Sequence, residues 1–160
     1  MHHKPPNAHQ RALRVRSSEC YITGLPYRAA PPKNSGAHPW TDNHMTAVST
    51  ISWSDNEVKL SGTSRAPIIT SPYFNIPQNI QVCMTTTGIL EAKAAKPVLK
   101  CLISGTEVIY KKSSKTYNSE DFNESGSATL IHNNSTVEIQ NAYAYSSAYL
   151  YIKTVTITYE

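Results

Sequence analysis

The sequence predicts an all-β protein: an antiparallel, jelly-roll-like β-sandwich of about nine or ten strands with at most one short helix. Three observations support this prediction. Segments rich in β-branched and aromatic residues recur along the chain, and turn-forming residues separate them. The 160 residues suffice for one domain with a sizeable core, but not for two well-stabilised ones. Charged residues make up only 16% of the chain, and serine, threonine, asparagine and ten tyrosines take their place.

In the N-terminal half we expect four strands and one extended crossover. The strands are predicted at residues 12–17, 20–23, 45–54 and 57–60. Turn-forming residues 54–56 separate the last two, which predicts a hairpin. Residues 26–43 contain four prolines together with a Lys-Asn-Ser-Gly stretch and are expected to form a loop. Residues 63–79 contain three prolines, so they are expected to be extended and mostly unpaired, or at a sheet edge, between the two halves of the domain.

In the C-terminal half we expect six strands and one short helix. The strands are predicted at residues 80–84, 98–103, 106–111, 127–132, 136–140 and 149–159. The connections at 104–105 and 133–135 each predict a hairpin. Residues 89–96 are rich in alanine and lysine and stop at a proline, which predicts a helix of about two turns. The polar residues 113–126 are predicted to form a loop.

The terminal strand carries apolar residues on both of its faces. Strict alternation puts Leu150 and Ile152 on one face. The other face would hold Tyr149, Tyr151, Val155, Ile157 and Tyr159. Two explanations stay open: a central position in the sheet, or a bulge that re-aims the later residues.

The chain is expected to form a basic N-terminal arm over residues 1–18 and a single β-sandwich domain over residues 19–160. The net charge is +4, and most of the excess lies near the start. We expect Arg11, Arg14 and Arg16 to dock the arm on a neighbouring subunit. No block of five or six arginines occurs, which disfavours nucleic acid as a partner. No apolar run approaches the ~20 residues of a membrane helix, and no signal-peptide pattern is present, so we expect folding in a cytoplasm without membrane insertion.

Three cysteines, Cys20, Cys83 and Cys101, are an odd number and show no C-x-x-C spacing. This pattern disfavours a disulfide framework and a zinc knuckle. Cys83 and Cys101 lie within apolar strand patterns, so buried free thiols are the default expectation for both. A disulfide between these two stays open.

One cluster has the composition of a metal site: His38, Asp42 and His44. On an extended segment all three side chains project to the same side, where imidazole and carboxylate groups can bind a divalent ion. The favoured alternative is a surface loop with scattered histidines. No Gly-x-Ser-x-Gly motif, cysteine–histidine pair or glycine-rich phosphate loop occurs. The sequence therefore predicts a protein that is not an enzyme and uses no cofactor or metal, with a metal-dependent enzyme as the least favoured alternative.

Closely spaced tyrosines in the stretch 141–151 point to binding. Tyr143, Tyr145 and Tyr149, with small residues between them, are predicted to form an aromatic platform on which a sugar ring or a partner backbone stacks. Trp40 in the proline-rich loop is a second exposed aromatic candidate, whereas Trp53 is expected in the core. The alternative, which is favoured, is that the tyrosines simply pack one sheet against its neighbour.

The stretch CYITGLPYRAA resembles a turn, V-x-I-x-G-L-P-[FY]-x-A, found in tail-fibre and other virion proteins of bacteriophages. The residues in the matching places are Tyr21, Ile22, Gly24, Leu25, Pro26, Tyr27 and Ala29. The loop that follows is rich in proline and basic residues, where the family shows glycine, alanine and serine. The resemblance implies a virion-associated β-module that assembles with other copies or contacts a host surface, and it brings no catalytic residues.

The favoured function is therefore a non-enzymatic viral or phage structural or attachment protein. It would be made in the host cytoplasm and located in the virion, as a homo-oligomer or with other virion proteins, and a host glycan is a candidate ligand. The alternative is a stand-alone carbohydrate-binding β-sandwich module that uses Tyr143, Tyr145 and Trp40.

Overall fold

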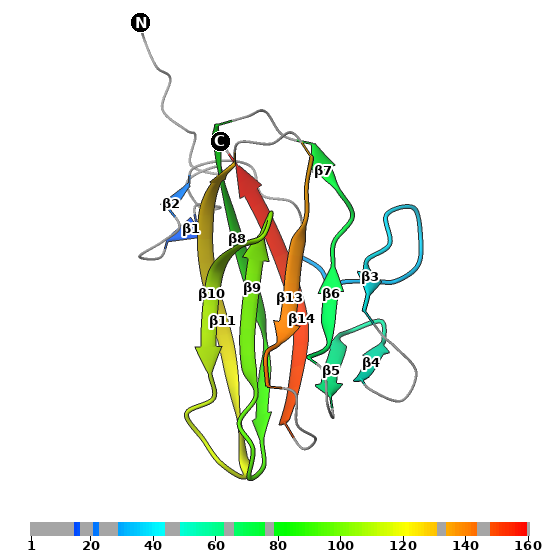
Figure 1. Cartoon of the computed structure of the whole chain (residues 1–160), viewed down its shortest axis with the longest axis vertical. Coiled ribbons are helices and arrows are strands. Elements are labelled where there is room, and N and C mark those ends of the chain that lie inside the picture. Colours follow the sequence, from blue (N-terminus) through cyan, green and yellow to red (C-terminus); the bar gives the residue numbers. More distant parts are fainter. Residues whose placement is uncertain are drawn as a thin grey trace, which may run out of the picture.

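A computed structural model describes residues 15–16, 21–22, 29–43, 49–62, 66–75, 79–130, 134–143 and 148–159. Within these ranges every regular element is a β-strand, every pairing is antiparallel, and the strands form two packed layers (Figure 1). The predicted all-β antiparallel sandwich is confirmed.

The first layer is a five-stranded sheet in the order β10-β9-β13-β6-β3. Its strands are β10 (Thr106–Lys112), β9 (Val98–Ile103), β13 (Val137–Asn141), β6 (Ile68–Thr70) and β3 (Thr41–Asp42). The second layer is a five-stranded sheet in the order β11-β8-β14-β5-β4. Its strands are β11 (Asn118–Leu130), β8 (Ile80–Ala92), β14 (Ala148–Tyr159), β5 (Val58–Gly62) and β4 (Ser49–Trp53).

Two short strand pairs flank these sheets. The strand β1 (Val15–Arg16) pairs with β2 (Tyr21–Ile22), and β7 (Phe74–Asn75) pairs with β12 (Asn134–Ser135). The β1–β2 pair matches the two short strands predicted near the N-terminus, in shortened form. The β6 and β7 strands lie in the proline-containing stretch that was predicted to be extended and mostly unpaired or at a sheet edge. That expectation is wrong for β6, which pairs with both β13 and β3.

The core lies between the two five-stranded sheets. Along β9, β13 and β14 buried residues alternate with more exposed ones, because successive side chains point to opposite faces. The largest fully buried side chains are Leu60, Ile69, Met84, Leu90, Leu99, Ile103, Ile139, Leu150, Ile152 and Val58. Both sheets contribute to this set, so the sandwich is held by one shared apolar core.

Two predicted hairpins are confirmed. The strands β4 and β5 pair across residues 54–57, where the Ser54 hydroxyl donates to the Glu57 carbonyl at 2.8 Å. The strands β9 and β10 are joined by Ser104 and Gly105, which both have positive φ, 48° and 82°. Such a pair of left-handed residues is what a two-residue turn between twisted strands requires.

Three predictions for the C-terminal half are wrong. Residues 89–92 continue β8 and form no helix, because pairing on both sides of this central strand outweighs local helix propensity. Residues 118–126 belong to β11, which runs along β8 as an edge strand with polar residues facing outward. No hairpin spans residues 127–140, because β11 and β13 lie in different sheets.

The terminal strand β14 satisfies both explanations that the sequence left open. It lies between β8 and β5 in the sheet, and its register against β8 shifts between Ile152 and Thr154. Because of this bulge, Val155 joins Leu150 and Ile152 in the core, while Tyr149 and Tyr151 lie on the opposite face.

The cysteines differ in state. Cys83 on β8 is disulfide-bonded, so the expectation of a free thiol there is wrong, whereas Cys101 on β9 is free and buried. The two therefore do not pair with each other, and Cys20 lies outside the described residues. Burial, reinforced by the Glu124 carboxylate, strongly raises the pKa of the Cys101 thiol. None of the described segments forms a helix that is long and apolar enough to cross a membrane.

Candidate functional site

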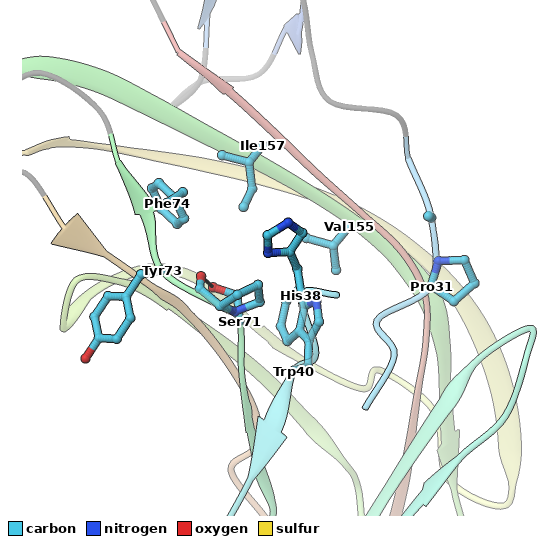
Figure 2. A pocket seen from close by; sticks show the side chains of 10 residues that line it. Pro31, His38, Trp40, Ser71, Tyr73, Phe74, Val155 and Ile157 are labelled. Atoms are coloured by element: carbon cyan, nitrogen blue, oxygen red, sulfur yellow. Dashed lines mark hydrogen bonds between the residues drawn. The ribbon is translucent and has the colours of Figure 1, made fainter. Parts of the chain in front are cut away.

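A cleft of about 480 Å³ opens beside the later half of β14. Its walls come from three parts of the chain that are far apart in sequence: the loop before β3, the segment between β6 and β7, and β14 itself (Figure 2). The lining residues are Ala30, Pro31, His38, Trp40, Ser71, Pro72, Tyr73, Phe74, Val155 and Ile157. This volume lies within the range of small-molecule binding sites.

The loop before β3 positions Trp40. The Trp40 amide donates to the Lys33 carbonyl at 2.6 Å and closes the loop, while Gly36 adopts the left-handed φ of 98° that the bend needs. Beyond β3, the Asn43 side chain accepts from the Ile68 amide at 2.7 Å and donates to the Ala66 carbonyl at 3.0 Å. Trp40 is thus held between two anchored points, and its half-buried ring packs against the core.

The segment after β6 forms the second wall, and Ser71 fixes it. The Ser71 hydroxyl accepts from the Val137 amide at 2.8 Å and donates to the Pro72 carbonyl at 2.9 Å. The Ser71 amide donates to the Val137 carbonyl at 2.9 Å. These bonds fix the course of the chain into Phe74, whose strand pairs with β12.

The third wall is the later half of β14. Val155 and Ile157 face the cleft, and the Val155 amide donates to the Ala30 carbonyl at 3.0 Å. This bond places Ala30 alongside the strand, and Ala30 and Pro31 extend the apolar lining of the cleft. The bulge in β14 is what turns Val155 and Ile157 toward this side.

The lining of the cleft is mostly apolar, with a few hydrogen-bonding groups. Lysine, arginine, aspartate and glutamate side chains are absent from its described lining. The indole N–H of Trp40, the His38 ring and the Tyr73 hydroxyl lie at the cleft, and none forms a hydrogen bond with the described part of the chain. Figure 2 shows the His38 ring near Val155, with Trp40 beside it and Tyr73 turned outward. Such a lining can bind a ligand that combines apolar faces with hydroxyl groups.

The residues of the predicted aromatic platform do not form a single surface. Trp40 lines the cleft. Tyr149 lies near the start of β14, six residues or about 20 Å along the strand before Val155. Tyr143 is half-buried just after β13, and its amide donates to the Asn141 side-chain oxygen at 3.3 Å. Tyr145 lies outside the described residues. The binding role of these tyrosines stays a prediction.

Tyr149 takes part in a polar cluster on the outer face of the second sheet. The Lys59 ammonium lies 4.3 Å from the centre of the Tyr149 ring and 5.7 Å from that of Tyr151. The Tyr151 hydroxyl donates to the Glu91 carboxylate at 3.4 Å. Burial, followed by the Glu91 charge, raises the pKa of the Tyr151 hydroxyl. A lysine of the same chain therefore lies over the ring on which a ligand was expected to stack.

The candidate metal cluster and the candidate arm are only partly described. His38 lines the cleft, while an Asp42 carboxylate oxygen accepts from the Trp53 indole at 2.9 Å, and His44 lies outside the described residues. Among the residues that the structure describes, no three His, Cys, Asp or Glu side chains are grouped to hold a metal ion. Arg11 and Arg14 also lie outside the described residues, as does the side chain of Arg16, so the arm contacts stay a prediction.

Sequence reasoning identified Trp40 and missed most of the cleft. Tyr73 and Phe74 follow Pro72 within the proline-containing crossover, and their aromatic pair was the available signal. The sequence around Val155 and Ile157 does not indicate a binding site. Only the bulge and the position of the loop before β3 show that these two residues face a cleft.

No family model matches the chain, and no curated protein does. Among solved structures, the chain is similar to the K1 cleaved adhesin domain of Lys-gingipain from Porphyromonas gingivalis, with a TM-score of 0.53 and 10% identity over 86% of this chain and 98% of that one. It is also similar to the CBM22-1-GH10 modules of xylanase 10B from Clostridium thermocellum, solved with xylohexaose, with a TM-score of 0.52 and 12% identity. That match covers 76% of this chain and 26% of the xylanase chain. At these identities the likeness shows the fold alone.

These comparisons overturn the resemblance to phage tail-fibre proteins. The similar structures include an adhesin domain and the CBM22-1-GH10 modules of a xylanase, and no family or curated match supports a phage domain. The resemblance rested on about ten residues, and a proline after a short β-branched run is too common a sequence pattern to identify a family. The prediction of a viral structural protein is wrong, and none of the comparisons supports a homo-oligomer or virion partners.

Proposed function

We propose that this protein is a carbohydrate-binding β-sandwich and that the cleft around Trp40 is its binding site. One observation carries the proposal: a half-buried tryptophan lies in a cleft of about 480 Å³, and its indole N–H has no hydrogen-bond partner in the described part of the chain. Sugar rings have apolar C–H faces and hydroxyl edges. An aromatic face with unpaired polar groups beside it suits both.

The similar structures support this choice over the alternatives. One of them comprises the CBM22-1-GH10 modules of a xylanase and was solved with xylohexaose. Another is a domain described as an adhesin. At such low identity, neither structure indicates which ligand this chain binds. Both nevertheless support testing a binding role for a protein with this fold.

The disulfide at Cys83 supports a place of action outside the reducing cytosol. Structural disulfides form and persist mainly in oxidising compartments. A protein that binds environmental or cell-surface glycans would act in such a compartment. This proposal replaces the expectation of a protein that is made in a host cytoplasm and located in a virion.

Affinity electrophoresis in gels that contain a polysaccharide tests the proposed function. The gels would hold xylan, mannan, soluble glucan, polygalacturonate or alginate, so that neutral and acidic chains are both sampled. We expect at least one polysaccharide to retard the wild-type protein. The variant Trp40→Ala should weaken that binding roughly thirtyfold, by the ~2 kcal/mol of a buried aromatic contact.

Two further variants separate loss of the site from loss of the fold. His38 is exposed, so His38→Ala should weaken binding while leaving the unfolding midpoint unchanged. Tyr110 is 60% exposed on β10, at the opposite edge of its sheet from β3 and outside the cleft lining, so Tyr110→Ala is the matched aromatic control and should bind as wild type. Equal retardation of the wild type, Trp40→Ala and His38→Ala would show that the cleft is not the site.

A further inference from the structure

Tyr73 is the most exposed of the large apolar side chains in the described residues, at 78%. Its neighbours in sequence, Pro72 and Phe74, both line the cleft. Figure 2 shows the Tyr73 ring at the rim, directed away from His38 and Trp40. An aromatic ring left this exposed contributes little to the core, yet the bonds of Ser71 and the pairing of β7 fix the backbone on either side of it.

The cleft and Tyr73 therefore offer two adjoining surfaces. A short saccharide that fills the cleft against Trp40 would leave its next units at the rim, beside the Tyr73 ring. Tyrosine provides a large, rigid contact surface at a low entropic cost, because it has only two side-chain torsions to fix.

The charge pattern restricts the chemical class of the ligand. No lysine, arginine, aspartate or glutamate lines the described cleft, so an ammonium group of a ligand would find no opposite charge there, and a carboxylate would meet only the His38 ring, the Trp40 indole N–H and the Tyr73 hydroxyl. Moving an unpaired charge onto an apolar lining carries a large desolvation cost. Lys59 and Glu91 could pair with a charged group of a ligand, but they lie beside Tyr149 and Tyr151 on the outer face of the second sheet.

We propose that the cleft and Tyr73 form consecutive subsites for an uncharged polysaccharide chain: a first subsite in the cleft at Trp40 and an extension subsite on the exposed Tyr73 ring. This inference rests on the proposed carbohydrate-binding function. It adds that the ligand is a neutral chain longer than the cleft, and that Tyr73 sets the dependence of affinity on chain length.

Calorimetric titration with xylo- and cello-oligosaccharides, from disaccharide to hexasaccharide, tests the extension subsite. For the wild type, affinity should rise with length beyond the oligomer that fills the cleft. In Tyr73→Ala the shortest oligomer that binds should keep its affinity, whereas the hexasaccharide should bind about five- to tenfold more weakly. Tyr117→Ala is the matched control, because Tyr117 is 74% exposed but lies outside the cleft lining.

The outcomes separate this inference from the proposed function. If Tyr73→Ala keeps the full length dependence while Trp40→Ala loses binding, the cleft binds sugar but the extension subsite is wrong. If polygalacturonate or alginate oligomers bind and neutral ones do not, the uncharged class is wrong. If Trp40→Ala and the wild type behave alike toward every saccharide, the proposed function itself fails.

Discussion

The Asn141 side chain on β13 donates a hydrogen bond to the Leu60 carbonyl on β5, at 3.1 Å, and so joins the two sheets. The same amide group donates to the Ala148 carbonyl at 2.8 Å. Its oxygen accepts from the amides of Val98 and Tyr143, each at 3.3 Å. Asn141 is fully buried, and all of its hydrogen-bonding capacity is used.

Removing this amide should destabilise the sandwich strongly. Asn141→Ala leaves several buried backbone groups without a partner, and we expect a loss of about 2–4 kcal/mol in the free energy of unfolding, measured by urea denaturation. Asn118→Ala is the control, because the exposed Asn118 side chain accepts a hydrogen bond only from the backbone amide of Ser119. A loss below about 1 kcal/mol for Asn141→Ala would mean that water replaces these bonds at little cost.

Gly88 on β8 should tolerate no side chain. A Cβ atom there would overlap the Tyr151 carbonyl oxygen and lie 2.7 Å from the Phe122 ring. Both neighbours are held within the sheet, so Gly88→Ala should lower stability by about 2 kcal/mol or more in the same urea assay. At Gly36 a Cβ atom meets nothing within 4 Å, and Gly36→Ala should cost only about 1 kcal/mol for its left-handed φ. Equal losses for the two variants would contradict this packing.

The cysteines should differ in alkylation. In the native protein Cys101 is fully buried and its thiol pKa is strongly raised, so maleimide should not label it. In denaturant without reductant, peptide mass spectrometry should find the label on Cys101 but not on Cys83. Addition of reductant should then expose Cys83. Labelling of Cys83 before reduction would rule out its disulfide.

The loop after β10 should respond to acid through Glu120. The Ser114 amide and hydroxyl donate to the two Glu120 carboxylate oxygens at 2.7 and 2.9 Å, and the amide bond is the main reason that the Glu120 pKa lies below its usual value. A lowered pKa means that the contribution is present above the ordinary carboxyl range and is lost as pH falls through the folded-state pKa. The Ser114 amide shift in an NMR titration should follow that step, and Glu120→Gln should abolish it. A titration midpoint at or above the ordinary glutamate value would contradict the bond.

Much of the fold could be predicted because many of its strands and turns have local sequence signals. The β9–β10 hairpin follows from apolar runs on either side of Ser104-Gly105, where the turn geometry needs residues that accept positive φ. The end of β8 and most of β11 could not be predicted in this way. Residues 89–96 carry helix formers, and β11 buries few apolar side chains besides Phe122, so only partner strands define these segments as β.

Less of the candidate site than of the fold could be predicted from the sequence. Trp40 could be singled out because a tryptophan in a proline-rich loop has no core pattern around it. The wall formed by β14 depends on the bulge in that strand. The bulge puts Val155 on the opposite face of the strand from Tyr149. A one-residue shift in a strand moves side chains to the other face, and alternation alone cannot locate it.

The most direct measurement is the fluorescence of Trp40 during a titration with a neutral polysaccharide. The chain has two tryptophans, so Trp53→Phe leaves Trp40 as the single reporter. We predict a saturable change in its emission on addition of the xylan, mannan or glucan that retards the protein in gels. The variant that also carries His38→Ala should need a higher polysaccharide concentration to reach the same change. Saturable polysaccharide binding by gel or calorimetry with an unchanged Trp40 signal would contradict the assignment of the cleft as the binding site.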